Sequence, residues 1–272
     1  MTGKELREAL RAGKSVYSTM VLGNSPRWPG LLKNAGVDFV FIDTEHVPID
    51  RITLSWMCYA YRALDLPPIV RIPSPDPYEA CKVLDGGASG VIAPYVESPD
   101  QVKALVGAAR YRPLKGDRLA QALDDPETLE PDLRESLERR NANNVIVVNI
   151  ESVPAMERLD EILSVPGLDA ALIGPNDLSN SLGIPDQYRH PRFNEAVETI
   201  LQKARAHNLG AGMHFIMDGL DLREQWIRAG CNLIIHGVDA GLFLDALRKD
   251  LAEIRRRVGD SRDDSKGEKV IV

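Results

Sequence analysis

The chain contains eight short apolar segments, each long enough to form one buried strand. They lie at about 16–22, 38–43, 67–72, 89–94, 144–150, 169–174, 210–215 and 232–237. Most are continuous apolar runs rather than alternating ones, which is typical of parallel strands buried on both faces. The intervening segments carry apolar residues at helical spacing. Eight alternating strand and helix units predict an α/β fold, specifically a closed (β/α)₈ TIM barrel.

Length and composition agree with a single domain. The 272 residues are 44% hydrophobic and 27% charged, as in an ordinary globular protein. We expect the barrel to span residues 1–259 and to be followed by a polar tail at 260–272. The long polar segment 111–128 interrupts the regular pattern, and we predict that it forms a loop over a functional rim.

The sequence lacks the usual nucleotide-binding motifs. No G-x-G-x-x-G follows the first strand, and no G-x-x-x-x-G-K-[ST] occurs. The glycine-rich segment 86–90 lies between a predicted helix and the next strand, so we interpret it as a helix end rather than a phosphate-binding loop. A Rossmann fold and a nucleotide cofactor are therefore disfavoured.

Charge and cysteine content exclude several classes of partner. The net charge of −7 and the absence of a basic patch argue against nucleic-acid binding. The charged N-terminus and the lack of a long apolar run argue against a secretory signal and a membrane span. Cys58, Cys81 and Cys231 are widely spaced, and we interpret them as buried thiols in a reducing cytoplasm.

Polar residues capable of chemistry follow four of the apolar segments. They are Asp43 to His46, Arg71, Glu151 and Asp177. Because the carboxyl ends of parallel strands meet at one rim of a barrel, we expect these side chains to lie close together. The sequence thus predicts a polar site at this rim.

Glu151 and Asp177 follow neighbouring strands, the fifth and the sixth. Two adjacent carboxylates with open positions for water and substrate suit Mg²⁺ or Mn²⁺. The alternative is that each acid caps a helix.

Arg71 and His46 are the candidates for charge stabilisation and proton transfer. A guanidinium at the rim suits a carboxylate or a developing enolate oxygen, although Arg71 could also form a salt bridge to Asp43 or Asp85. His46 is a candidate general base, and the alternative is a surface histidine. A zinc site formed by several histidines is a weaker possibility, because His214 and His236 belong to no metal-binding motif.

The distribution of lysine argues against one class of aldolase. A Schiff-base aldolase needs a desolvated lysine on a barrel strand. None of the eight apolar segments carries one in its core or at its last position. Carbonyl chemistry on this chain would therefore depend on a metal.

Five ordered motifs resemble those of the HpcH/HpaI family of class II pyruvate aldolases, and the resemblance covers residues 15–250. The motifs are Phe41 to His46, Val70-Arg71, Val83 to Ala88, Asn149 to Ser152 and Ile173 to Ser179. The family includes 4-hydroxy-2-oxoheptanedioate and 2-keto-3-deoxy sugar acid aldolases. The resemblance implies a TIM barrel of the phosphoenolpyruvate/pyruvate-binding type, with Mg²⁺, Mn²⁺ or Co²⁺ on Glu151 and Asp177.

The resemblance also implies roles for individual residues. Arg71 would stabilise the enolate oxygen, and Asp43 would orient groups near the acceptor. His46, oriented by Asp85, would act as base through a metal-bound water. The resemblance further implies that pyruvate is bound with the help of the residues Asn149, Gly174, Pro175, Asn176 and Asp177.

The expected activity is the reversible, metal-dependent cleavage of a 4-hydroxy-2-oxo acid to pyruvate and an aldehyde, through a metal-bound pyruvate enolate. The alternatives are a citrate-synthase-like or macrophomate-synthase-like condensation, an oxaloacetate decarboxylase, or a barrel that binds 2-oxo acids without turnover. The family resemblance implies a homohexamer, a trimer of dimers that exchanges a C-terminal helix carrying Leu244, Leu247, Leu251 and Ile254. Departures at Thr44, Asn149 and Met20 and after Arg110 leave the aldehyde unidentified.

Overall fold

The computed structural model describes residues 1–216 and 219–260, which form a closed barrel of eight parallel strands. The strands follow one another around the barrel in chain order. They are β1 (Val16–Val21), β2 (Val40–Asp43), β3 (Pro68–Arg71), β4 (Gly90–Ala93), β5 (Val145–Asn149), β6 (Ala170–Ile173), β7 (Gly210–Phe215) and β8 (Leu233–Val238). The predicted (β/α)₈ fold is confirmed.

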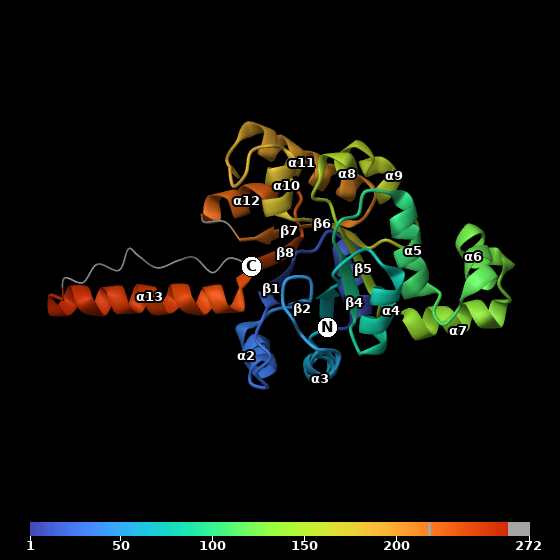
Figure 1. Ribbon diagram of the computed structural model, residues 1–272, viewed down its shortest axis with the longest axis horizontal. Coiled ribbons are helices and arrows are strands. Elements are labelled where there is room, and N and C mark those ends of the chain that lie inside the picture. The colour runs from blue at the N-terminus through green and yellow to red at the C-terminus, as the bar shows by residue number, and fades with distance from the viewer. Residues whose placement is uncertain (217–218, 261–272) are drawn as a thin grey trace.

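Helices surround the barrel (Figure 1). The first of them, α1, precedes the first strand. They are α1 (Gly3–Arg11), α2 (Trp28–Ala35), α3 (Arg51–Arg62), α4 (Pro77–Asp85), α5 (Pro99–Arg110), α6 (Gly116–Asp124), the 3₁₀ turn η1 (Pro126–Thr128), α7 (Pro131–Asn141), α8 (Val153–Glu157), α9 (Leu159–Leu163), α10 (Pro175–Ser181), α11 (Pro191–Ala206), α12 (Leu220–Arg228) and α13 (Asp239–Val258). None of the described helices is long and apolar enough to cross a membrane.

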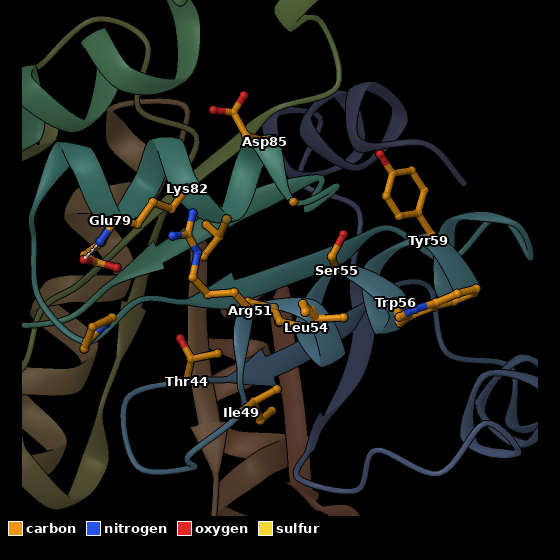
Figure 2. Close-up of a pocket in the computed structure, with 14 residues that line it drawn as sticks. Thr44, Ile49, Arg51, Leu54, Ser55, Trp56, Tyr59, Glu79, Lys82 and Asp85 are labelled. Atoms are coloured by element: carbon orange, nitrogen blue, oxygen red, sulfur yellow. Dashed lines mark hydrogen bonds and ion pairs between the residues drawn. The ribbon is translucent and has the colours of Figure 1, made fainter.

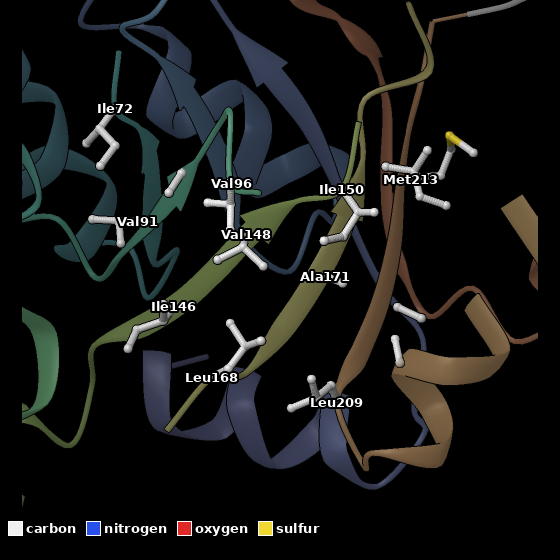
Figure 3. Packing of buried hydrophobic residues seen from close by; sticks show 14 of the residues in the cluster. Ile72, Val91, Val96, Ile146, Val148, Ile150, Leu168, Ala171, Leu209 and Met213 are labelled. Carbon is white, nitrogen blue, oxygen red and sulfur yellow. The ribbon is translucent and has the colours of Figure 1, made fainter. Parts of the chain in front are cut away.

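The core has an inner and an outer layer, because alternate residues of each strand point to opposite faces. Val145 and Val147 of β5 belong to the layer inside the barrel, together with Leu6 and Leu10 of α1. Ile146 of the same strand packs in the layer between the barrel and its helices, part of which is shown in Figure 3. This double burial explains why the strands are apolar without interruption.

A cluster of arginines surrounds a single acid at the amino end of the barrel. Asp169, fully buried just before β6, accepts hydrogen bonds from Arg7 and Arg11 at 3.1 Å each and from Arg110. It also accepts one from the backbone N–H of Ile146 at 2.9 Å. These contacts tie α1 and α5 to the start of β5 and β6.

The prediction of a rim loop at 111–128 is wrong. This segment contains α6 and η1, and α7 follows it, with Ala122, Leu129 and Leu137 forming a small core of their own. The physical reason is the direction of α5, which starts beside the carboxyl end of β4 and ends next to the start of β5. The segment therefore joins the barrel at its amino end, opposite the rim.

The glycine-rich segment 86–90 ends a helix, as predicted. Helix α4 stops at Asp85, and Gly87 has a positive φ of 105° before β4 begins at Gly90. Cys58 and Cys231 are buried, Cys81 is half-buried, and all three are free thiols. The predicted polar tail lies almost wholly outside the described residues, which end at 260.

Candidate active site

Asp43 and Arg71 are brought together by strand register. They are directly paired at the ends of β2 and β3, and Arg71 Nε and Nη2 donate to the two carboxylate oxygens of Asp43 at 2.7 and 2.8 Å. Burial alone would raise the pKa of Asp43, but the hydrogen bonds and charge of Arg71 outweigh it and the pKa is lowered. The salt bridge to Asp43 is compatible with the predicted stabilisation of an enolate oxygen by Arg71, because the salt bridge also orients the guanidinium.

Glu45 is a member of this cluster to which sequence reasoning assigned no role. Its carboxylate lies 3.1 Å from Arg71 Nε and 3.7 Å from His46 Nε2. The Glu45 side chain is 8% exposed, whereas that of His46 is 43% exposed. His46 therefore sits at the open side of the cluster, with a buried carboxylate beside it.

Glu151 follows β5 and is held by two hydrogen bonds. Its Oε1 accepts from the backbone N–H of Tyr95 at 2.8 Å, and its Oε2 accepts from Asn149 Nδ2 at 2.8 Å. Burial raises the pKa of Glu151 to about 7, and the charges of Asp177 and Glu45 act in the same direction. A buried acid with like charges around it is a site that a cation would stabilise.

Asp177 lies in the first turn of α10, which starts directly after β6 and Gly174. A Cβ added to Gly174 would lie 2.6 Å from Glu151 Oε2 and 3.6 Å from Asp177 Oδ2. The two carboxylates therefore face the same small space, which is open because residue 174 has no side chain. Nearby, the buried Oδ1 of Asn149 has no hydrogen-bond partner among the described residues.

These oxygens fit a divalent cation of the Mg²⁺ or Mn²⁺ type, which prefers carboxylates and keeps positions for water and substrate. Residues 1–216 and 219–260 hold no group of three or more His, Cys, Asp or Glu side chains placed to bind a metal. His214 instead is buried and its Nε2 lies 3.1 Å from the carbonyl oxygen of Gly237. The described residues thus favour a two-carboxylate site over a zinc site built from histidines.

The structure does not bring Asp85 to His46 within one chain. Asp85 is the last residue of α4, so it lies towards the amino end of the barrel, whereas His46 follows the carboxyl end of β2. Its exposed carboxylate forms an ion pair with Arg112 instead. Asp85 therefore does not contact His46 within one chain, and its role in orienting that histidine stays a prediction. A motif shows that a residue is present but does not show at which end of its helix it lies in the fold.

A groove of about 790 Å³ runs along the outer surface between α3 and α4. Figure 2 shows Glu79 and Asp85 at opposite ends of α4, with Asp85 at the end that lies near Tyr59 of α3. The groove contains Thr44 but neither the Glu151 and Asp177 carboxylates nor Arg71. It is therefore separate from the candidate active site.

Tyr95 is a second residue that sequence reasoning missed. The fourth apolar segment leads into Pro94 and carries no charged residue, so nothing marked it as part of the rim. In the structure the Tyr95 side chain lies near Glu45, whose carboxylate raises the pKa of Tyr95, while its backbone N–H holds Glu151. Tyr95 thus connects the proton-transfer side of the site with the carboxylate side.

The remaining predicted residues lie on α10 or beside it. Gly174 precedes α10, and Pro175 is the first residue of that helix, a position where a missing N–H costs no helical hydrogen bond. The helix therefore starts at the rim, directly after β6. Asn176 Nδ2 donates to Asp186 at 3.5 Å, and its carbonyl oxygen is bonded within the helix. The structure thus brings these residues to the rim with Glu151, Asn149 and Arg71. Their contacts with substrate stay a prediction.

Known proteins match this chain over most of its length. The sequence model of the HpcH/HpaI aldolase/citrate lyase family matches residues 19–246. A 2-keto-3-deoxy-L-rhamnonate aldolase of Escherichia coli strain UMN026 is 32% identical over 251 residues, which cover 90% of this chain and 91% of that protein.

Two solved structures share the fold at comparable identity. An HpcH/HpaI aldolase from Desulfitobacterium hafniense DCB-2 superposes with a TM-score of 0.78 at 28% identity, covering 92% of this chain and 96% of the other. The citrate synthase SbnG superposes with a TM-score of 0.79 at 31% identity, covering 93% and 98%. The barrel fold therefore occurs both in a protein named as an aldolase and in one named as a citrate synthase.

Proposed function

Because the chain belongs to the HpcH/HpaI aldolase/citrate lyase family, we propose that it is a metal-dependent aldolase of 4-hydroxy-2-oxo acids. It would cleave such an acid to pyruvate and an aldehyde and would catalyse the reverse addition. The observation that carries this proposal is a buried, oriented guanidinium beside two carboxylates that face one small space. The described strands contain no lysine that could form a Schiff base instead.

Glu151 and Asp177 would hold the divalent cation. Such a cation, when bound, stabilises negative charge on the substrate's carboxylate and keto oxygens as a Lewis acid. Asn149 uses its amide nitrogen to hold Glu151. We therefore propose that Asn149 positions this carboxylate, and that the backbone from Gly174 to Asp177 contributes to binding the 2-oxo acid.

Arg71 would stabilise the oxygen on which charge develops. Asp43 engages Nε and Nη2, so the guanidinium is held in one orientation and Nη1 stays outside this bidentate pair. A preorganised cation costs no reorientation when the enolate forms, which is why such groups contribute strongly to catalysis.

His46 would accept the proton of the C4 hydroxyl, with the Glu45 carboxylate beside it stabilising the resulting positive charge. As the C4 carbonyl forms, the C3–C4 bond breaks and its electron pair passes to the C2 oxygen of the leaving enolate. A proton delivered to C3 then gives pyruvate. The aldehyde and pyruvate together contain all the atoms of the substrate.

Exchange of the pyruvate methyl protons with solvent deuterium, followed by NMR, tests the proposal because it needs only the enolate-forming half of the site. With Mg²⁺, Mn²⁺ or Co²⁺ added, we expect the wild-type protein to catalyse exchange and Arg71→Ala and Glu151→Ala to lose nearly all of it. Lys103→Ala, which changes an exposed side chain of α5, serves as the control. Near wild-type exchange in either site variant would contradict the assignment.

Similarity to the citrate synthase SbnG favours a second candidate, in which the same enolate condenses with a different acceptor. Oxaloacetate would then be a substrate, either as acceptor or through loss of carbon dioxide. Product analysis with oxaloacetate, compared with a 4-hydroxy-2-oxo acid, separates the two activities.

We also propose that the chain forms a homo-oligomer, for which a hexamer is the expected state. Helix α13 extends away from the barrel in Figure 1. Along its length it exposes large apolar side chains, namely Leu242, Phe243, Leu247, Leu251, Ile254 and Val258. Such a helix is stable in water only when another surface covers it. Light scattering should show an oligomer for the wild type and a smaller species for Leu247→Asp/Leu251→Asp.

An oligomer offers the remaining route by which Asp85 could act on His46. Since Asp85 lies far from the rim of its own barrel, we propose that any catalytic role of this carboxylate is exerted on a second copy. Mixing Asp85→Asn with His46→Gln would then restore cleavage of a 4-hydroxy-2-oxo acid above the level of either variant, whereas a purely structural role would give no restoration.

A further inference from the structure

The backbone of Tyr95 adopts a conformation that is unfavourable for its residue type. Its φ is +56°, in the left-handed region. The other described non-glycine residues with positive φ are Asp65, Asp186 and Asn208, whose short polar side chains tolerate this region. For a bulky residue the left-handed conformation is sterically unfavourable. A tyrosine at this position therefore needs a compensating role for its side chain.

The backbone contact of Tyr95 does not supply that role. Its N–H donates to Glu151 Oε1 at 2.8 Å, and this bond orients one of the proposed metal ligands. Any residue with a backbone N–H could make the same bond, and glycine would do so without strain. The choice of tyrosine must therefore be explained by the phenol.

The phenol lies at the open side of the site. Tyr95 is 53% exposed, and its phenol lies close enough to the buried carboxylate of Glu45 for that carboxylate to raise the pKa of Tyr95. The Glu45 carboxylate, burial and the charges of Asp177 and Glu151 raise the pKa of Tyr95 to about 12. An exposed, neutral hydroxyl, which can accept as well as donate a hydrogen bond, thus stands between the proposed base and the proposed metal ligands.

The charges around the phenol restrict the kind of aldehyde that can approach it. The carboxylates of Asp43, Glu45, Glu151 and Asp177 belong to this cluster. Its cation, Arg71, is already engaged by Asp43 and Glu45. The 2-oxo acid end of the substrate would use the bound cation, so a second carboxylate on the aldehyde would meet uncompensated negative charge. A neutral aldehyde with a hydroxyl group would meet hydrogen-bonding partners instead.

We propose that Tyr95 is a positioning residue for the aldehyde half of the substrate. Its hydroxyl hydrogen-bonds to a hydroxyl group on carbon 2 of a neutral hydroxyaldehyde, and the site discriminates against aldehydes that carry a carboxylate. This inference rests on the proposed aldolase function and specifies the acceptor that the rim selects.

The test compares Tyr95→Phe with wild type in the addition of pyruvate to three aldehydes. Glycolaldehyde carries the hydroxyl, propionaldehyde has a methyl group in its place, and succinic semialdehyde carries a carboxylate. For glycolaldehyde we expect kcat/KM to fall about tenfold through a higher KM for the aldehyde, as for loss of one hydrogen bond. For propionaldehyde we expect less than a twofold change, and wild type should prefer glycolaldehyde to succinic semialdehyde.

Two further measurements keep the outcome interpretable. Tyr78→Phe removes the hydroxyl of an exposed tyrosine on α4 and should leave the kinetic constants for all three aldehydes unchanged. Tyr95→Gly relieves the positive φ, so it should unfold at an equal or higher temperature while losing the preference for glycolaldehyde.

The two hypotheses fail in different ways. If wild type exchanges pyruvate protons but Tyr95→Phe loses equal activity with glycolaldehyde and propionaldehyde, the phenol acts through Glu45 or Glu151 and this inference is overturned. A preference for succinic semialdehyde would overturn the charge argument. If wild type shows no metal-dependent exchange, the aldolase proposal itself fails.

Discussion

The two ends of the barrel hold charge clusters of opposite design. At the amino end, three arginines surround the one buried carboxylate of Asp169, and Arg110 is also bonded to the carbonyl oxygens of Asn144 and Gly167. At the carboxyl rim, Arg71 is the cation beside several acids, and like charges together with burial raise the pKa of Glu151 to about 7. Positive charge is in excess at one end and negative charge at the other.

The difference separates a stabilising cluster from a reactive one. Asp169 receives four hydrogen bonds from side chains and backbone, so its charge is fully compensated within the protein. The rim carboxylates are not compensated in this way, and they gain from a cation and a substrate that arrive from solution. Barrel enzymes in general place chemistry at the carboxyl rim and stability at the other end.

The largest expected effect is on the amino end. Asp169→Asn leaves three guanidinium groups around a neutral amide, and we expect a loss of about 3–5 kcal/mol in the free energy of unfolding, as for a buried ion pair that loses one partner. Urea unfolding measures this loss. Proton exchange per folded molecule should stay within twofold of wild type, and a specific loss of exchange would show that the two ends are coupled.

The matching change at the rim is Arg71→Lys, which keeps the positive charge but removes the bidentate fork. We expect pyruvate proton exchange to fall by about 10²–10³-fold, the range for loss of one preorganised donor to a developing oxyanion. Arg7→Lys at the amino end is the control and should retain exchange. Equal effects of the two substitutions would contradict the assignment of Arg71.

The pH dependence of stability should carry a contribution from His214. Burial lowers its pKa to about 4, whereas an unfolded histidine has a pKa near 6.5. Between these values the unfolded chain binds a proton that the folded protein does not, so stability falls as pH decreases from about 6.5 to 4. The loss attributable to His214 is about 3 kcal/mol below this window. Unfolding of wild type and His214→Gln at pH 7.0, 5.5 and 4.5 measures it, and parallel curves would refute it.

The smallest expected effect concerns ordinary helix caps, which should not differ between the two ends. Thr2 caps α1 at the amino end and Ser98 caps α5 at the rim, each as part of a capping box. We expect Thr2→Ala and Ser98→Ala each to cost about 1 kcal/mol of stability without loss of exchange. A larger effect of Ser98→Ala on activity would mean that the start of α5 contributes to the site.

Sequence reasoning placed the site residues that follow strands directly. The barrel rule assigns Asp43, Arg71, Glu151 and Asp177 to one rim, and the structure brings all four there. Local spacing was enough because each residue lies at a strand end or within four residues of one. The chemical roles of these residues stay predictions that the exchange experiment tests.

Reasoning failed where the position of a residue depends on the direction of a helix or on backbone conformation. Asp85 is the last residue of a helix that runs back from the rim, and the segment 111–128 follows another such helix, so both lie near the amino end. Tyr95 follows a strand without a charged residue, and no local motif indicates its positive φ. Glu45 was visible in the motif, but its central place between Arg71 and His46 depends on how β2 and β3 pair.

The sequence by itself determined the fold class, the order of the strands and the identity of most rim residues, because burial on both faces imposes continuous apolar runs that can be read locally. Only the tertiary structure decided which charges meet. Strand register decides that Arg71 contacts Asp43 rather than Asp85. The end of the barrel to which each helix returns decides that the charge of Asp169, and not that of Glu151, is compensated by arginines. Electrostatic interactions between side chains act over a few ångströms in space, and distance along the chain does not reveal that separation.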